Sequence, residues 1–168
     1  MDQDFRGWAP DVPKQTFVIM TEDIQINLSI SAIQERRFVL MPLEEMLPGN
    51  FSGRMEIDHL ITTEIDEACH QMTVDAGIRY KMDCQVICEL VVAVVFIIEP
   101  FKAMVRIDPE QRVITFSADF VPTLLNTAYG TLRGVLAEKT KDTNLANYPL
   151  QLSPIEELIK MNRFKVKE

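Results

Sequence analysis

The clearest pattern in this sequence is an alternation of apolar and polar residues that becomes a continuous apolar run within residues 71–98. Residues 72–82 place an apolar side chain at every second position, and a period of two puts the two sets on opposite faces of a β-strand. A polar step at residues 81–83 leads to a second strand, which is apolar on both faces over residues 90–98. A strand that is apolar on both faces needs cover on both. We therefore expect this hairpin to meet a helix, a second subunit or a client chain.

Two further strands are predicted before this hairpin. Residues 16–32 form the first, in two pieces separated by a polar step that is typical of a bulge or bend, and residues 35–40 extend it. Residues 51–65 alternate again and form the next. Residues 41–50 hold two prolines and a glycine and are interpreted as a connection. Four strands in succession, with no crossover helix between the last three, predict an antiparallel meander.

Beyond residue 120 the apolar period becomes helical and predicts a helix from Pro122 to about Lys141. Residues 153–156, Ser-Pro-Ile-Glu, match a capping box with Ser153 at the cap and open a short final helix. Residues 101–120 fit either strand or helix. The fold class is therefore α+β: a four-stranded antiparallel meander followed by two helices packed on one face.

Length and charge limit the organisation and the partners. The 168 residues fit a single domain, which we place at residues 16–162, between an extended N-terminal arm at 1–15 and a charged, frayed tail at 163–168. The net charge of −8 repels phosphate backbones, so no nucleic-acid partner is expected.

The cysteines and the N-terminus point to the cytoplasm. The first ten residues hold two acids and no apolar core, unlike a signal peptide. The apolar run at residues 86–98 is too short for a membrane-spanning helix and carries Glu89, so no membrane insertion is expected. Three cysteines without an export signal indicate reduced thiols. Cys84 and Cys88 would lie about 13 Å apart on one strand, too far to share a zinc ion, and we expect no metal and no cofactor.

No constellation of catalytic residues is recognisable. The sequence has no glycine-rich phosphate loop, no serine nucleophile elbow and no Cys/His signature. His59 falls on an apolar strand face and is interpreted as a satisfied core or interface residue. We therefore expect that the protein is not an enzyme.

Three segments, TEDIQI at residues 21–26, ICEL at residues 87–90 and the L-x-P motif at residues 152–154, resemble parts of the SecB-type preprotein export chaperones. Residues 21–26, TEDIQI, are similar to the family's first-strand stretch T-K-D-I-S-F, and residues 87–90, ICEL, are similar to L-C-E-V of a later strand. The third segment is a Pro-led helix with a small and an aromatic residue, then a loop and the L-x-P motif at residues 152–154 before a last helix. The likeness in element order spans most of residues 16–160.

The resemblance implies a SecB-like fold, assembled as a homo-dimer or a homo-tetramer, that holds unfolded polypeptides in apolar grooves without nucleotide, in protein export and transport. It also implies that Asp23, Ile87 and Glu89 contact a SecA-like motor ATPase. A related branch of these chaperones recognises an antitoxin. A non-enzymatic adaptor with one dedicated partner, such as an antitoxin, is therefore the alternative function.

Apolar residues in the connection before the third predicted strand are candidates for a client-binding groove. They are Leu43, Met46, Leu47 and Phe51. Loops usually lie at the surface, and a large exposed apolar patch marks a binding groove or an oligomer interface. The nine methionines offer adaptable apolar surface, although each serves equally well as core packing.

Overall fold

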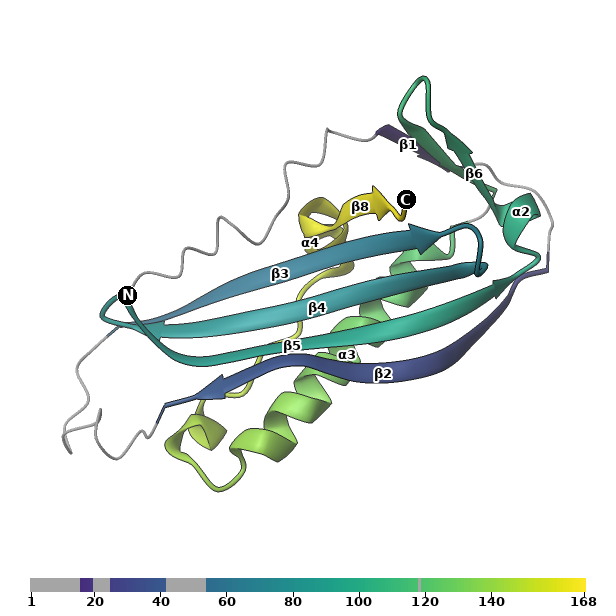
Figure 1. The fold of residues 1–168 in the computed structure, drawn as a ribbon. Helices are drawn as coiled ribbons and strands as arrows, with labels where there is room; N and C mark the ends of the chain where they lie inside the picture. The colour runs from purple at the N-terminus through teal and green to yellow at the C-terminus, as the bar shows by residue number, and fades with distance from the viewer. Residues whose placement is uncertain (1–15, 20–24, 42–53, 118) are drawn as a thin grey trace.

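A computed structural model describes residues 16–19, 25–41, 54–117 and 119–168 of the protein. Its strands form a five-stranded sheet of order β2-β5-β4-β3-β8 and a three-stranded sheet of order β1-β7-β6 (Figure 1). The elements are β1 (Thr16–Ile19), β2 (Asn27–Leu40), β3 (Met55–Asp66), β4 (Gln71–Met82), β5 (Gln85–Glu99), α2 (Phe101–Met104), β6 (Val105–Asp108), β7 (Val113–Phe116), α3 (Val121–Thr140), the 3-10 helix η2 (Asn144–Asn147), α4 (Ile155–Met161) and β8 (Arg163–Val166).

The predicted central hairpin is confirmed as β4 and β5. Asp83 and Cys84 join the two strands, and both have positive φ angles, 48° and 69°. A two-residue hairpin turn with positive φ at both positions matches the right-handed twist of the flanking strands. The even-numbered residues of β4 face the core, where Met72, Val74 and Ile78 have no exposed surface.

The predicted meander is wrong for the first strand. β3, β4 and β5 are neighbours in chain order, but β2 pairs antiparallel with the far edge of β5, from Asn27 opposite Glu99 to Leu40 opposite Cys88. A meander would leave β5, the most apolar strand, at the edge of the sheet. Pairing β2 with β5 places β5 inside the sheet.

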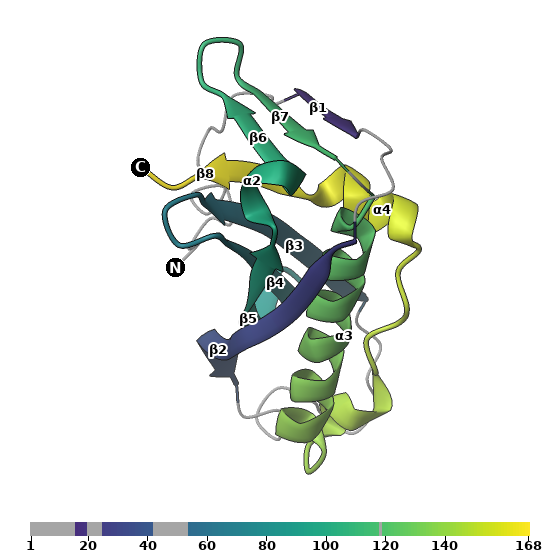
Figure 2. The ribbon, with the colours of Figure 1, turned by 90° about the vertical axis from the view of Figure 1, so that its right-hand side faces the viewer.

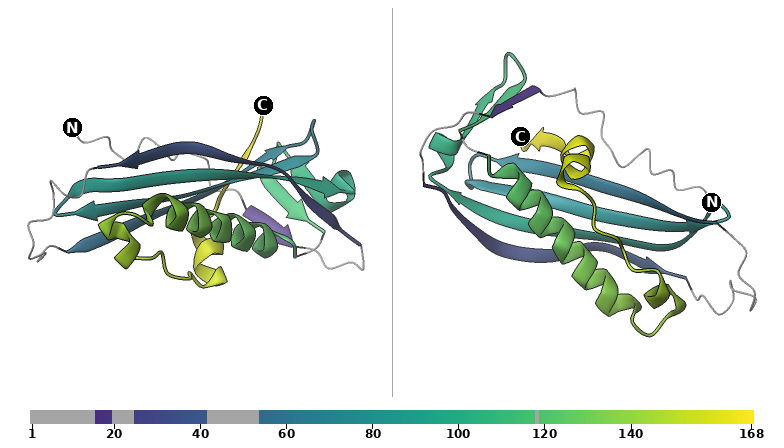
Figure 3. Two further views of the ribbon diagram at one scale, coloured as in Figure 1. Left: turned by 90° about the horizontal axis from the view of Figure 1, so that it is seen from below. Right: turned by 180° about the vertical axis from the view of Figure 1, so that it is seen from behind.

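The two helices predicted from the sequence, α3 and α4, pack on one face of the large sheet, as expected (Figure 3). α3 lies across β4 and β5, and α4 lies beside α3 against β3. The buried side of α3 is the apolar stripe that the helical period predicts: Leu124, Leu125, Ala128, Leu132 and Leu136. The structure therefore has a two-layer α+β architecture with one core between helices and sheet.

Three segments differ from the expectation. β1, expected as the first piece of the first strand, pairs in parallel with β7 in the small sheet, which lies at one end of the molecule beyond β8 (Figure 2). The region left open between strand and helix contains both, the single turn α2 and the hairpin β6–β7. Residues 163–168, expected as a frayed tail, contain β8, which is held in parallel on β3 because Phe164 is buried and Lys165 pairs with Glu64 at 2.9 Å.

Two glycines on the exposed side of α3 give the first prediction. A methyl group added at Gly130 or at Gly134 would meet no other atom within 4 Å. Glycine inside a helix is about 0.5–1 kcal/mol less favourable than alanine. We therefore expect Gly130→Ala and Gly134→Ala each to raise the free energy of unfolding by about 0.5–1 kcal/mol, measured by urea denaturation. A loss of stability in either variant would contradict the open space seen beside these glycines.

Candidate binding pocket

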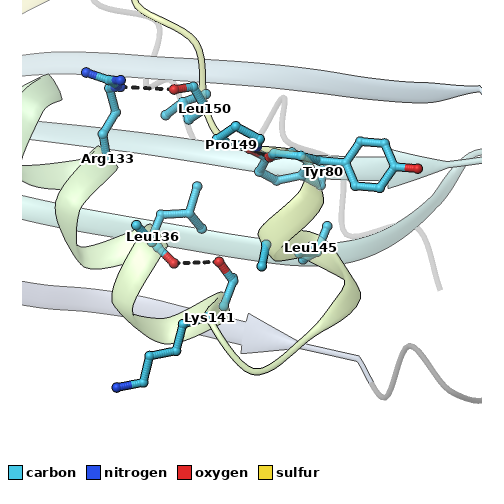
Figure 4. Close-up of a pocket in the computed structure, with 11 residues that line it drawn as sticks. Tyr80, Arg133, Leu136, Lys141, Leu145, Pro149 and Leu150 are labelled. Carbon is cyan, nitrogen blue, oxygen red and sulfur yellow. Dashed lines mark hydrogen bonds between the residues drawn. The ribbon is translucent and has the colours of Figure 1, made fainter.

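A cavity of about 300 Å³ lies between the C-terminal half of α3, the helix η2, the segment that follows η2 and Tyr80 of β4. Figure 4 shows Leu136, Leu145 and Pro149 around it, whereas the ammonium group of Lys141 points away. The remaining lining residues are Arg133, Ala137, Thr140, Ala146, Tyr148 and Leu150. The walls are therefore mainly apolar.

Two of the cavity walls are helices, α3 and η2, and the sequence at the end of each explains its position. α3 continues its apolar stripe to Leu136 and ends at Thr140, whose hydroxyl donates to the carbonyl of Leu136 at 2.8 Å. The chain then turns into η2, where the side-chain oxygen of Thr143 accepts a hydrogen bond from the N–H of Leu145 at 3.2 Å. This cap is the usual role of threonine at a helix start, and Leu145 is buried at the base of the turn.

The third wall is the start of an extended segment, residues 148–153, which we call the strap. Side chains of the body hold its carbonyl groups: Tyr80 donates to Tyr148 O at 3.0 Å, and Arg133 donates through Nε to Leu150 O at 3.0 Å. Buried backbone carbonyls are costly to leave without a partner. These bonds therefore hold the strap against the body of the protein.

Tyr129 on α3 ties the middle of the strap to the sheet. Its hydroxyl donates to Gln151 O at 3.3 Å, accepts from Ser153 Oγ at 3.1 Å and lies 3.3 Å from His59 Nδ1 on β3. Burial raises the pKa of Tyr129 and lowers the pKa of His59, so both side chains are neutral at pH 7. The expected capping box is wrong, because Pro154 is the N-cap of α4 and the Ser153 hydroxyl is bound to Tyr129.

The chemistry of the pocket suits binding. It offers mainly aromatic and aliphatic side chains, the pattern of a pocket that receives apolar groups. Among the described residues, no three His, Cys, Asp or Glu side chains lie together as a metal site would need. Likewise, no helix in the described part of the chain is long and apolar enough to cross a membrane.

A buried cluster of charges lies on the opposite face of the sheet. Glu89 of β5 is 3% exposed, and its carboxylate lies 3.0 Å from Arg79 Nη2 and 2.8 Å from Arg37 Nε. Arg36, one residue before Arg37, reaches Asp75 at 3.6 Å. A β-bulge between Glu35 and Arg37 locally breaks the alternation of β2. The result is a set of charges that compensate one another.

The site residues predicted from the sequence are only partly placed by the structure. Asp23 and the groove candidates Leu43, Met46, Leu47 and Phe51 lie outside the described residues. Ile87 is 0% exposed and packs in the core, and Glu89 is in the buried charge cluster. Their proposed role in binding a motor ATPase stays a prediction.

Sequence reasoning missed the pocket itself, whose walls come from four separate parts of the chain. The available signals were the α3 stripe that continues to Leu136, the loop rich in turn residues that follows, and an aromatic residue, Tyr80, on the core-facing side of β4. None of these signals indicates by itself that the segments meet.

No protein-family model matches the sequence, and no curated protein is significantly similar to it. Among solved structures, the chain is similar to the SecB-like chaperone Rv1957 of Mycobacterium tuberculosis, in complex with a ChAD peptide from the Rv1956 HigA1 antitoxin. The TM-score is 0.48 with 15% identity, over 75% of this chain and 86% of that one. A protein of unknown function from Streptococcus agalactiae gives a TM-score of 0.38 with 16% identity, over 78% of this chain and all of that one. At these scores neither likeness assigns a function.

Proposed function

We propose that this protein is a nucleotide-independent, chaperone-like binding protein that holds unfolded polypeptides through their apolar side chains. The observation that carries the proposal is the apolar cavity of about 300 Å³ beside α3. Its volume is at the lower limit of ligand pockets, so it accommodates one or two side chains of a longer chain. The resemblance of three sequence segments to the SecB-type export chaperones supports the same class of partner.

The strap extends the apolar surface beyond the cavity. Tyr148 is 40% exposed at the rim, and Leu152 is 76% exposed four residues further on. A polypeptide anchored in the cavity would cross both side chains as it leaves the pocket. Exposed apolar groups next to a pocket are typical of surfaces that bind other chains.

The resemblance to the SecB-type export chaperones adds the location, the assembly and an ATPase partner to the proposal. The protein would act in the cytoplasm as a homo-dimer or a homo-tetramer, and a SecA-like ATPase would contact Asp23, Ile87 and Glu89. Since Ile87 and Glu89 are buried, a partner would reach Glu89 only by way of the exposed Arg37 that covers it.

Filling the cavity tests the proposal. Ala137 lines the cavity on the exposed side of α3, so Ala137→Trp blocks it without removing a core side chain. We expect this variant to bind a permanently unfolded, fluorescently labelled polypeptide at least about tenfold more weakly, a loss of about 1.4 kcal/mol in binding free energy. The measurement is fluorescence anisotropy.

The matched control is Glu138→Trp, which places the same ring one residue away, outside the cavity. The Glu138 carboxylate pairs with Lys141 at the surface, so the substitution costs little stability. Equal affinities of the two variants would rule out the cavity as the client site. Binding of one natural partner but of no unrelated unfolded chain would replace the chaperone by an adaptor with a dedicated partner.

A further inference from the structure

In the part of the chain that the structure describes, half of one edge of the large sheet has no neighbouring strand. β8 pairs with β3 only from Thr62 to Ile65, so among the described residues no strand lies beside residues 55–61 on that edge. Figure 1 shows β8 beside the C-terminal half of β3 only. The pairing of β3 with β4 runs without a register shift from Met55 to Asp66, so the open half is as regular as the half that β8 covers.

The backbone groups that point to this edge follow from a single hydrogen bond. The N–H of Lys167 donates to Ile65 O at 2.9 Å, so the main-chain groups of Ile65 face β8. Successive residues of a strand point their main-chain groups to opposite edges, so those of every second residue before Ile65 face the same way. Ile57 and His59 therefore point their N–H and C=O groups to the open edge, where no described residue pairs with them, a ready site for another strand.

β8 shows what kind of strand this edge accepts. Its core-facing residue Phe164 is buried. On the other face Lys165 Nζ lies 2.9 Å from Glu64, and Lys167 Nζ, just beyond β8, lies 2.7 Å from Asp66. The bound strand thus alternates lysine with apolar residues and matches the alternating acids of β3.

The open half repeats this arrangement. Glu56 and Asp58 lie on the same face as Glu64, separated from it by Leu60 and Thr62. Met55 and Ile57 lie on the core side, partly buried. Glu56 is exposed, and Asp58 pairs with Lys81 of β4 at 2.5 Å. A second basic, alternating strand would therefore meet acids on one face, Glu56 and Asp58, and apolar side chains on the other, Met55 and Ile57.

The opposite edge of the sheet is built differently. β2 has two register shifts, between Ile30 and Ala32 and between Glu35 and Arg37. Bulges of this kind twist an edge strand and hinder pairing with another chain. The regular, acidic half of β3 is therefore the better edge for a bound strand.

We infer that residues 55–61 of β3 bind an extended polypeptide strand that carries lysine or arginine at alternate positions and apolar residues between them, by adding it to the sheet in line with β8. The inference rests on the proposed binding of polypeptides and adds a second site, separate from the cavity beside α3, with its own sequence preference. Main-chain hydrogen bonds supply affinity in this mode, and alternate side chains supply specificity.

The test uses the full chain and the synthetic peptide acetyl-RFKVKVK-amide, whose first five residues copy the sequence of residues 163–167. We expect saturable binding and at least about tenfold slower amide hydrogen exchange at Ile57 and His59, followed by NMR, because these N–H groups become bonded. The control peptide acetyl-KKRKFVV-amide has the same composition without alternation and should bind at least about tenfold more weakly.

Matched variants test the charge match. Glu56→Lys should weaken peptide binding at least about tenfold, whereas Glu110→Lys, the same charge change in the β6–β7 turn, should leave it unchanged. Equal effects of the two variants, or binding without protection of Ile57 and His59, would overturn the inference. Protection of these amides before peptide is added would also overturn it, because the edge would already hold a second copy or another segment.

The two binding measurements, made on the same protein, distinguish failure of the strand site from failure of the proposed function. If the unfolded client binds and Ala137→Trp weakens it while the peptide gives no protection on β3, only the strand site is wrong. If neither ligand binds, both proposals are wrong.

Discussion

Replacing Glu89 by alanine is expected to lower the free energy of unfolding by about 3–5 kcal/mol, the usual cost of removing one partner of a buried ion pair. The Arg79 side chain is only 7% exposed and makes two contacts with the same Glu89 oxygen, through Nε at 3.1 Å and Nη2 at 3.0 Å. Without the carboxylate, its positive charge would stay buried with no compensation from Glu89. Urea denaturation of the two proteins measures the difference.

An exposed ion pair on the same sheet provides the comparison. Glu64 and Lys165 are 2.9 Å apart with side chains 32% and 39% exposed, and pairs of this kind contribute about 0–1 kcal/mol. Glu64→Ala should therefore cost far less than Glu89→Ala. If Glu89→Ala unfolds at the same urea concentration as the native chain, Glu89 is not a structural residue, and a role in partner binding becomes the better explanation of its place in the sequence.

The three thiols are expected to differ in reactivity by about three orders of magnitude. Cys88 is completely buried, and burial, with a smaller contribution from the neighbouring Glu89 carboxylate, raises its pKa from 9.0 to about 12. Cys69 and Cys84 are exposed. At pH 8 the thiolate fraction of Cys88 would be about a thousandfold below that of an ordinary thiol, and only the thiolate reacts.

Reaction with a disulfide reagent at pH 8 measures this difference. Two thiols should react at once in the native protein and the third only slowly, whereas all three should react together in urea. The double variant Cys69→Ser, Cys84→Ser isolates the slow thiol. Three equal rates in the native protein would show that β5 is open to solvent at Cys88.

The same pKa shift links Cys88 to stability at alkaline pH. The native state keeps the thiol protonated up to a pKa of about 12, whereas the unfolded chain loses the proton near pH 9. The contribution of Cys88 to stability is therefore fully present below about pH 9 and is lost progressively as the pH rises from 9 toward 12.

Much of the local structure follows from residue periods. The alternation in residues 71–82 predicts β4, the apolar run after it predicts β5, and the three- and four-residue steps after Pro122 predict α3. Each of these periods is a local property, because the face on which a side chain lies depends on the geometry of its own strand or helix. These predictions are confirmed by the structure to within a few residues.

The partner of a segment does not follow from its period, for the same physical reason. Nothing in the period of β2 says whether it pairs with β3 or with β5, and the burial of β5 decides it. Ser153 fits a capping box in sequence, but the Tyr129 hydroxyl, 24 residues away, binds it instead. Residues 163–168 are charged, yet they hold a strand because Glu64 and Asp66 of β3 bind their lysines.

The sequence by itself therefore determined the α+β class, the strands of the central hairpin, the two helices and the apolar face that each buries, because these depend on spacing along the chain. The tertiary structure alone decided the strand order, the cavity beside α3, the charge cluster around Glu89 and the open edge of β3. Each of these joins residues far apart in sequence, and their contacts exist only after hydrophobic burial has chosen which elements lie side by side.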